Sequence, residues 1–258
     1  ARYLLAKRLA YEDVTIEDIN GFRFKIPSIK ESLGFNLLVN GVYEPNILNF
    51  LMAYLKPGDN FIDIGANVGV CTIPCASCVS PAGNVMAIEA SPHIFEYLCH
   101  NVAENKLHNI FLENYAASAK DFEEKYFYEA PNDHFGMGSF GPQFHSSPIL
   151  VQCRTLDSML LDKNISRVKV IKIDVEGYES SVFDGASHLL SNADAPLIIF
   201  EFRDWAEKRL GLQPGESQRK LLDYGYDIWT FEDFIKNKKP LSRAMTEDEF
   251  DLVANKRK

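Results

Sequence analysis

A glycine-containing turn after a short apolar segment is the feature of this sequence best suited to binding a ligand. Asp63 lies near the end of the apolar segment 60–64, and Gly65 and Gly69 follow it. Glycine lets the backbone approach a ligand closely, and a helix that begins after the turn offers unpaired N–H groups beside the ligand. With an acid at the end of the segment, the turn suits a ligand that carries a positive amino group and a carboxylate.

Glu89 follows the next apolar segment and is a second candidate for ligand binding. An acid at this point of an α/β fold can accept hydrogen bonds from both hydroxyls of a ribose. The dinucleotide fingerprint Gly-x-Gly-x-x-Gly is missing, because the corresponding positions hold Gly65, Asn67 and Val70. We therefore expect a cofactor with a free ribose and an amino-acid part. The alternative is a tight turn with two acids that bind nothing.

Three further acids, Asp174, Glu176 and Glu179, follow the apolar segment 168–173. The carboxyl ends of parallel strands face the ligand crevice of an open sheet, so we expect these acids at the site. There they can orient an amino group of the ligand or act as a general base on a hydroxyl. Acids in the first turn of a helix also stabilise the helix, which is the alternative for Glu179.

The segments that position these acids alternate between strand and helix patterns. Asn20-Gly21 predicts a small leading hairpin, and Pro45 opens a helical pattern that ends before Pro57. Strands are then predicted at 60–64, 85–88, 109–113, 168–173, 196–200, 226–230 and 250–254, and helices at 70–79, 92–104, 180–190 and 217–224. Repeated units of this kind predict an α/β fold, with a mostly parallel sheet and helices on both faces.

An aromatic-rich and glycine-rich segment at about 118–155 interrupts the alternation. Loops on a rigid scaffold carry specificity, so we expect substrate contacts in this insertion. The chain is expected to divide into a β/α extension at 1–56 and a Rossmann-like domain at 57–258 that contains the insertion.

Composition restricts the partners and the location of the protein. The 258 residues include 27 Lys and Arg and 36 Asp and Glu, which gives a formal net charge of −9. Binding to nucleic-acid phosphates relies on clustered Lys and Arg, so we expect no nucleic-acid partner. No apolar stretch reaches about 18 residues, and Lys7, Arg8 and Glu12 interrupt the N-terminal apolar run. We expect no membrane span, no signal peptide and a cytoplasmic protein.

Four motifs together resemble the FkbM family of methyltransferases. They are Asp63-Ile-Gly-Ala-Asn-Val-Gly69, Glu89-Ala-Ser-Pro92, Thr155-Leu-Asp157 and Ile173-Asp-Val-Glu-Gly-Tyr-Glu179, and the similarity spans about residues 42–202. The resemblance implies a class I methyltransferase fold with a seven-stranded sheet and S-adenosylmethionine as the methyl donor. It also implies O-methylation of a sugar hydroxyl or of another small or glycan-linked acceptor.

The same resemblance implies which residues meet the cofactor. The turn from Asp63 to Gly69 would surround the methionine moiety, and Glu89 and Ala90 would meet the ribose. Ala117 would lie near the adenine. The residues expected to bind the cofactor are Glu44, Asp63, Gly65, Asn67, Gly69, Glu89, Ala90, Ser91, Ala117 and Asp174.

An alcohol acceptor must lose its proton, and Asp174 would face the transferred methyl group. His145, His134 and Glu176 are candidate general bases, because a neutral imidazole or a carboxylate can accept a proton. The expected catalytic residues are Asp174, Glu176 and His145.

Several other interpretations stay open. Asp174 and Glu201 end successive strands and could bind Mg²⁺, as in metal-assisted methyltransferases, but Phe202 stands where that class has a further polar ligand. A nitrogen acceptor is the closest alternative, and a module that keeps the fold without catalysis is another.

A cysteine pattern suggests one more cofactor. Cys71, Cys75 and Cys78 have the spacing that binds an iron–sulfur cluster in radical S-adenosylmethionine enzymes. On a helix they share one face, and we expect them to pack in the core. The prediction is therefore a methyltransferase that needs no metal ion and acts on a small-molecule or glycan acceptor, with assembly as a homodimer left open.

Overall fold

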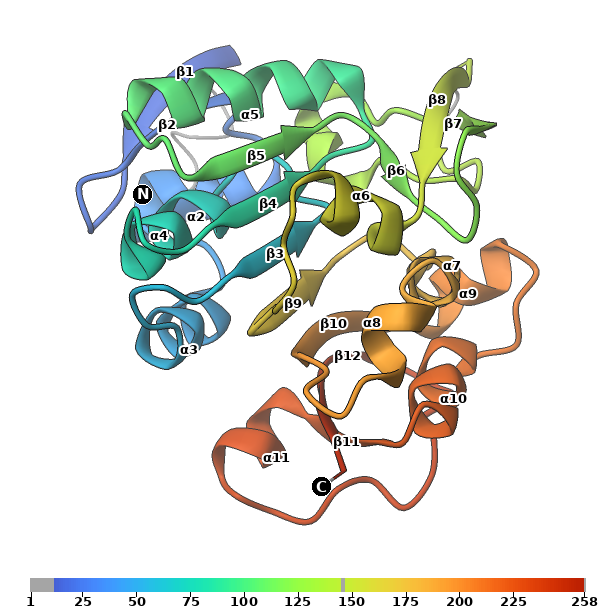
Figure 1. The fold of residues 1–258 in the computed structure, drawn as a ribbon. Coiled ribbons are helices and arrows are strands. Elements are labelled where there is room, and N and C mark those ends of the chain that lie inside the picture. Colours follow the sequence, from blue (N-terminus) through green and yellow to red (C-terminus); the bar gives the residue numbers. More distant parts are fainter. Residues whose placement is uncertain (1–11, 145–146, 258) are drawn as a thin grey trace.

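A seven-stranded sheet forms the centre of the computed structural model, which describes residues 12–144 and 147–257 (Figure 1). In sheet order the strands are β11 (Tyr226–Thr230), β12 (Glu249–Lys256), β10 (Leu197–Arg203), β9 (Val170–Ile173), β3 (Phe61–Ile64), β4 (Val85–Ile88) and β5 (Ile110–Glu113). Neighbouring strands from β10 to β5 are parallel, and β12 is antiparallel to β10 and β11. The predicted seven-stranded, mostly parallel sheet is confirmed.

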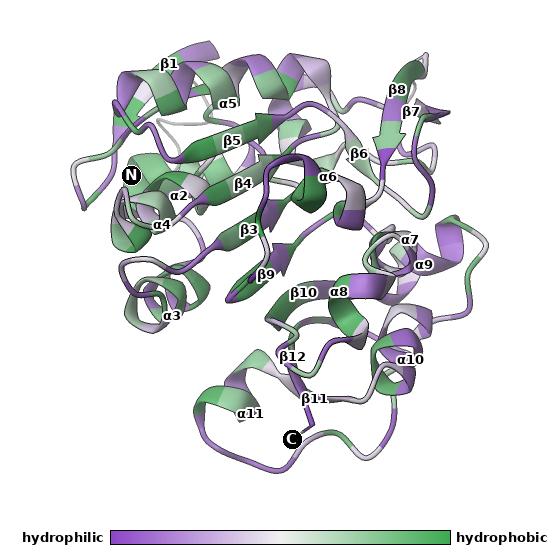
Figure 2. Cartoon of the chain, in the orientation of Figure 1, coloured by the Kyte–Doolittle hydropathy of each residue, from purple (hydrophilic) through white to green (hydrophobic). Residues whose placement is uncertain are grey.

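Helices cover both faces of the sheet because its strands are apolar on both sides. Phe61 and Val170 point to one face, and Ile62 and Ile171 point to the other. The first face is covered by α3 (Pro45–Tyr54), α4 (Thr72–Val79), α5 (Pro92–Glu104) and α11 (Phe231–Ile235). The second is covered by α6 (Leu156–Asp162), α7 (Glu179–Asp184), α8 (Ser187–Ser191) and α10 (Glu216–Asp223). Figure 2 shows the central strands as mainly hydrophobic.

The N-terminal segment packs on the first face. Strands β1 (Glu12–Glu17) and β2 (Arg23–Ser28) form the predicted hairpin, and Phe24 shares a core with Leu98 of α5. Helix α2 (Ser32–Asn40) follows, although the sequence patterns did not predict it. Glu31 caps its first turn, and Gly41, in the left-handed conformation, ends it.

The insertion contains more regular structure than predicted. Strands β6 (Ala116–Ala117), β8 (Ile149–Arg154) and β7 (Glu123–Phe127) form a separate three-stranded sheet in that order, and η1 (Asn132–Met137) is a short 3-10 helix. The single helix predicted at 180–190 is wrong, because α7 and α8 are separated at Gly185. A Cβ at Gly185 would lie 1.9 Å from the carbonyl oxygen of Ser118, just after β6. The chain at Gly185 therefore passes too close to the end of β6 for a larger residue.

Candidate active site

Two cavities meet at the carboxyl ends of β3, β4 and β9. The first, the cofactor cavity, is lined by residues of the β3–α4 turn, by the end of β4 and by aromatic side chains of the insertion. The second, the acidic cavity, opens beyond the turn toward α2, α3, β10 and β12. The residues that line both are Gly65, Asn67, Gly136, Asp174 and Glu176.

The turn after β3 brings backbone to the junction of the cavities. Gly65 has φ +77°, and a Cβ there would lie 1.9 Å from the carbonyl oxygen of Asp174, so only glycine fits. Asn67 also has positive φ, and its side-chain oxygen accepts a hydrogen bond from the N–H of Val68 at 2.8 Å. Gly69 lies against Leu98 and lines neither cavity, so its positive φ serves the turn itself.

Glu89 is fixed in place at the edge of the cofactor cavity. One carboxylate oxygen accepts a hydrogen bond from the N–H of Asn67 at 3.0 Å, and the other accepts one from the N–H of Ser91 at 2.9 Å. Burial raises the pKa of Glu89 to about 7, although these two hydrogen bonds favour the charged form. Because the two N–H groups hold both carboxylate oxygens of Glu89 at the edge of the cavity, a ribose there can donate hydrogen bonds to them.

Flat rings and small residues enclose the other end of the cofactor cavity. Ala90 and Ala117 line it, and the rings of Phe140 and Tyr178 lie 4.3 Å apart between centroids. The hydroxyl of Tyr178 accepts a hydrogen bond from Lys125 at 2.7 Å. An apolar slot beside a carboxylate that can bind a ribose fits the aromatic base of a nucleoside.

The acidic cavity holds far more negative than positive side chains. Among the described residues, its lining includes seven carboxylates and only Lys172 and Arg203 as cations. The carboxylates belong to Glu31, Glu44, Asp63, Asp174, Glu176, Glu201 and Asp251. Burial raises the pKa of Asp63 and of Asp251, because a desolvated carboxylate is disfavoured. Lys172 is buried among these acids and contacts Asp174 at 3.3 Å.

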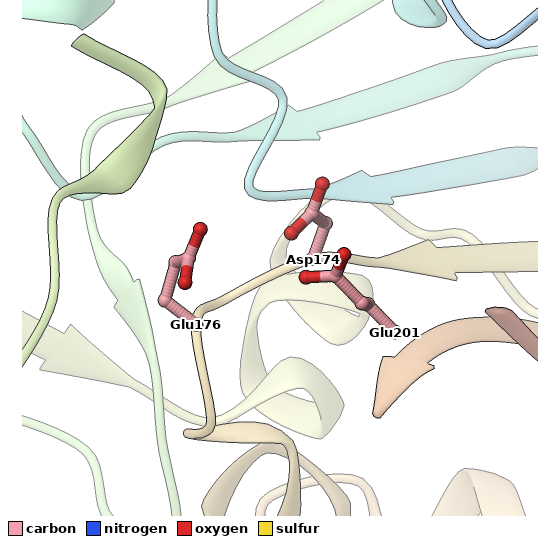
Figure 3. Close-up of side chains that lie close together, drawn as sticks. All are labelled: Asp174, Glu176 and Glu201. Carbon is pink, nitrogen blue, oxygen red and sulfur yellow. The ribbon is translucent and has the colours of Figure 1, made fainter. Parts of the chain in front are cut away.

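Asp174, Glu176 and Glu201 form the tightest acidic group, which we call the acidic cluster. One carboxylate oxygen of each lies within 4.8 Å of the others, and Figure 3 shows the three side chains converging from the ends of β9 and β10. Glu176 is only 6% exposed, and its Oε2 accepts no hydrogen bond. Burial, with Asp174 nearby, raises the pKa of Glu176 to about 7.

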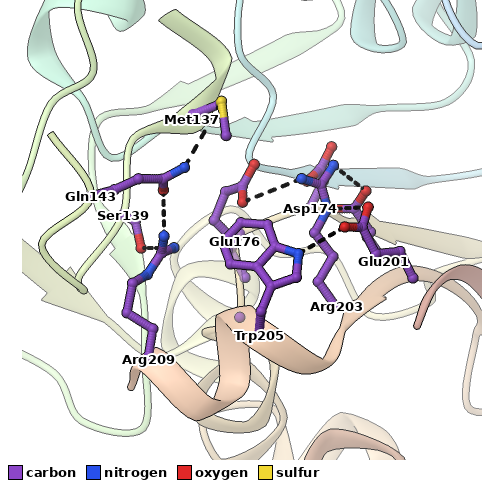
Figure 4. Close-up of polar contacts among 12 residues, drawn as sticks. Met137, Ser139, Gln143, Asp174, Glu176, Glu201, Arg203, Trp205 and Arg209 are labelled. Atoms are coloured by element: carbon purple, nitrogen blue, oxygen red, sulfur yellow. Dashed lines mark hydrogen bonds and ion pairs between the residues drawn. The ribbon is translucent and has the colours of Figure 1, made fainter. Parts of the chain in front are cut away.

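Arg203 approaches the acidic cluster from the end of β10. It contacts Glu201 at 2.6 Å and Glu176 at 3.9 Å, and these contacts are drawn in Figure 4. Its guanidinium also lies over the ring of Trp205. Burial raises the pKa of Glu201 despite this contact, with Asp174 adding to the effect.

Most of the predicted site residues come together. Glu44 lines the acidic cavity from the N-terminus of α3, with one buried oxygen that accepts no hydrogen bond. Ser91 caps α5 and lines the cofactor cavity. His134 is exposed beside Asp133 and lines neither cavity, so the structure does not bring this candidate base to the site. The candidate base His145 lies outside the described residues.

Two further groups resolve alternatives that the sequence left open. The carboxylate of Glu179 turns back to accept hydrogen bonds from the N–H groups of Val175 and Gly177, which is a structural role.

Cys71 and Cys75 are buried in the core with Phe61, so the expected core packing is confirmed for them. Cys78, on the same helix, is half-buried.

Four charged residues of the acidic cavity have no role predicted from sequence: Glu31, which caps α2, and Lys172, Arg203 and Asp251. Lys172 interrupts an otherwise apolar strand, which is a signal that could have identified it. Arg203 lies two residues beyond Glu201 at the end of β10. Asp251 pairs directly with Glu201 across β10 and β12, and only the antiparallel return of β12 places it there.

Comparisons with known proteins place the chain in a methyltransferase family. Residues 63–228 match the family model described as the methyltransferase FkbM domain. The hexuronic acid methyltransferase AglP of Haloferax volcanii is 21% identical over 198 residues, which cover 76% of this chain and 78% of that protein.

Solved methyltransferase structures also align with this chain, at low sequence identity. A precorrin-6y C5,15-methyltransferase from Geobacter metallireducens aligns with a TM-score of 0.46 at 13% identity, covering 82% of this chain and 87% of that one. An S-adenosylmethionine-dependent O-methyltransferase from Thermotoga maritima aligns with a TM-score of 0.46 at 15% identity, covering 95% and 78%.

Proposed function

We propose that this chain, which belongs to the FkbM family of S-adenosylmethionine-dependent methyltransferases, methylates a hydroxyl group of a sugar or another small polar acceptor. The observation that carries the proposal is the junction of the two cavities at Gly65 and Asp174. A cofactor in the first cavity would present its methyl group to an acceptor in the second.

The cofactor cavity and its junction with the acidic cavity have groups for each part of S-adenosylmethionine. Glu89 offers two oriented carboxylate oxygens to the ribose hydroxyls, and the slot beside Ala117 offers apolar surface to the adenine. Past the junction, in the adjoining part of the acidic cavity, Glu44 and Asp63 each have a buried oxygen that accepts no hydrogen bond, which suits the amino group of the methionine moiety. When bound, the cofactor supplies a sulfonium methyl group that an acceptor oxygen can attack in line.

The protein's own contribution is to position the acceptor and to accept its proton. In our proposal Asp174 lies beside the transferred methyl group. Glu176 accepts the hydroxyl proton, because its carboxylate lines the acidic cavity and burial, with Asp174 nearby, raises its pKa to about 7. Holding the hydroxyl between these two residues turns a bimolecular encounter into an oriented reaction.

A sugar is the acceptor class that we would test first. The relative AglP is named a hexuronic acid methyltransferase. The acidic cavity also offers several carboxylate oxygens, which can accept hydrogen bonds from neighbouring hydroxyls of one polyol.

No helix among the described residues is long and apolar enough to cross a membrane.

The test is an acceptor screen with S-adenosylmethionine labelled in its methyl group. Neutral sugars, uronic acids and amino sugars would be incubated with the enzyme, and products would be assigned by mass spectrometry and NMR. The proposal predicts a methyl group on a hydroxyl oxygen of one of these acceptors and slower transfer by Glu176→Gln. A product methylated on nitrogen would contradict it.

A further inference from the structure

We propose that the acidic cluster of Asp174, Glu176 and Glu201 binds a divalent cation such as Mg²⁺ or Mn²⁺ at the floor of the acidic cavity. The binding site itself is independent of the acceptor's identity. Only the catalytic role of the ion, described below, rests on the proposed function.

The geometry of the cluster suits an ion of this size. Magnesium and calcium bind carboxylate oxygens at about 2.0 to 2.6 Å, so oxygens on opposite sides of one ion lie about 4 to 5 Å apart. One oxygen from each of the three side chains lies within 4.8 Å of the others. Three carboxylates with open space beside them leave positions for water or an acceptor oxygen, as magnesium sites in enzymes commonly do.

Glu176 is the observation that points to a ligand beyond the three acids themselves. Glu176 lines the acidic cavity and is only 6% exposed, and its Oε2 accepts no hydrogen bond. The nearest cationic group is Nη1 of Arg203 at 3.9 Å, too far for a hydrogen bond. A buried carboxylate oxygen that accepts no hydrogen bond costs free energy unless a ligand satisfies it.

The surrounding charges leave the cluster short of positive charge. Glu201 and Asp251 stand directly opposite each other on antiparallel strands, and like charges in this register repel each other. Lys172 has Asp63, Asp174 and Glu44 around it, so its single charge is shared among three acids. The single positive charge of Arg203 is likewise shared among Glu176, Glu201 and Glu249. A divalent cation would offset this excess.

The ion would have a direct use in transfer of a methyl group to oxygen. An acceptor hydroxyl bound to the ion loses its proton more readily, because the cation stabilises the alkoxide. The oxygen–carbon bond then forms as the carbon–sulfur bond of the donor breaks, and the proton passes to the oxygen of Glu176 that is not bound to the ion. Sequence analysis did not predict this site, because it considered only Asp174 and Glu201 as ligands of a metal ion. The third ligand, Glu176, enters through its left-handed backbone conformation at φ 52°.

The experiment is a titration of the metal-free protein with Mn²⁺, followed by electron paramagnetic resonance of the free ion. The wild type is expected to bind one Mn²⁺ per chain, with Mg²⁺ competing. Glu201→Gln and Glu176→Gln should each weaken binding at least tenfold, because each removes one charged ligand. Glu249→Gln is the matched control: it removes an acid that contacts Arg203 from outside the cavity, and it should change affinity less than twofold.

The outcome can be separated from that of the proposed function. Circular dichroism would confirm that each variant is folded, and calorimetry with S-adenosylhomocysteine would be run on the same preparations. No saturable Mn²⁺ binding by a wild type that binds S-adenosylhomocysteine would overturn the metal site and leave the methyltransferase intact. Binding that neither cluster variant weakens would also overturn it. A bound ion without O-methylation of any acceptor would instead count against the proposed function.

Discussion

Glu89 shows how a single side chain can be prepared for its ligand before the ligand arrives. Two backbone N–H groups, one from the β3–α4 turn and one from the start of α5, hold its two oxygens. Each oxygen keeps a lone pair for a ribose hydroxyl. The sequence could predict this residue, because its place after an apolar strand is enough to put it at the crevice.

The raised pKa of Glu89 predicts a pH dependence for cofactor binding. Burial moves the pKa from its ordinary value near 4.5 to about 7, so the carboxylate becomes protonated as the pH falls through 7. The ionised form accepts both ribose hydrogen bonds, and affinity should fall about three- to tenfold between pH 8 and pH 6. Calorimetry with S-adenosylhomocysteine would measure this trend. Glu89→Gln should bind more weakly and with a flatter profile, and a flat profile in the wild type would be the opposite result.

At the scale of elements, the β3–α4 turn decides how closely β3 and β9 can approach at the site. Gly65→Ala places a Cβ 1.9 Å from the carbonyl oxygen of Asp174, so backbone must move. We expect a loss of more than about 3 kcal/mol in the free energy of unfolding, measured by urea denaturation.

Gly58→Ala is the matched control for this variant. Gly58 also has positive φ, at +92°, but no atom lies within 4 Å of its would-be Cβ. Only the left-handed strain of about 1 kcal/mol should appear there. Equal costs at the two positions would mean that the close approach of the strands is not what requires Gly65.

The elements differ in how well the sequence predicted them. Strand β4 and helix α5 have the predicted bounds, because uninterrupted apolar runs and the pair Ser91-Pro92 mark them clearly. Helix α2 was missed, since its cap is Glu31 and the pattern of its apolar residues is weak. The pairing of β6, β7 and β8 into one sheet was also missed. It depends on pairing between segments far apart in the chain, such as Ala116 with Cys153, which no local pattern records.

At the scale of the whole molecule, the N-terminal hairpin is bonded to the same region that positions the cofactor. Asn101 of α5 is fully buried and bridges two parts of the chain. Its amide accepts from the N–H of Lys25 at 2.7 Å and donates to the carbonyl oxygens of Lys25 and Val68, both at 2.9 Å. Val68 belongs to the β3–α4 turn, so hairpin, helix and turn are joined through one side chain.

This arrangement predicts that Asn101→Ala destabilises the hairpin and the turn together. Three backbone groups lose their partner in a buried place, and we expect a cost of about 2 to 4 kcal/mol in thermal or urea unfolding. Asn105→Ala is the comparison, because Asn105 makes similar hydrogen bonds to Arg23 in a more exposed place. It should cost less than about 1 kcal/mol. Unfolding of the hairpin alone, with the cofactor affinity unchanged, would contradict the coupling.

The most direct measurement is a crystal structure of the protein with S-adenosylhomocysteine. The account predicts that both ribose hydroxyls lie within hydrogen-bond distance of Glu89, with the adenine against Ala117 and Tyr178 and the sulfur at the junction beside Gly65 and Asp174. The acidic cavity should then open directly onto the sulfur. A ribose away from Glu89, or a sulfur pointing away from the acidic cavity, would contradict the assignment of the two cavities and the proposal of methyl transfer built on it.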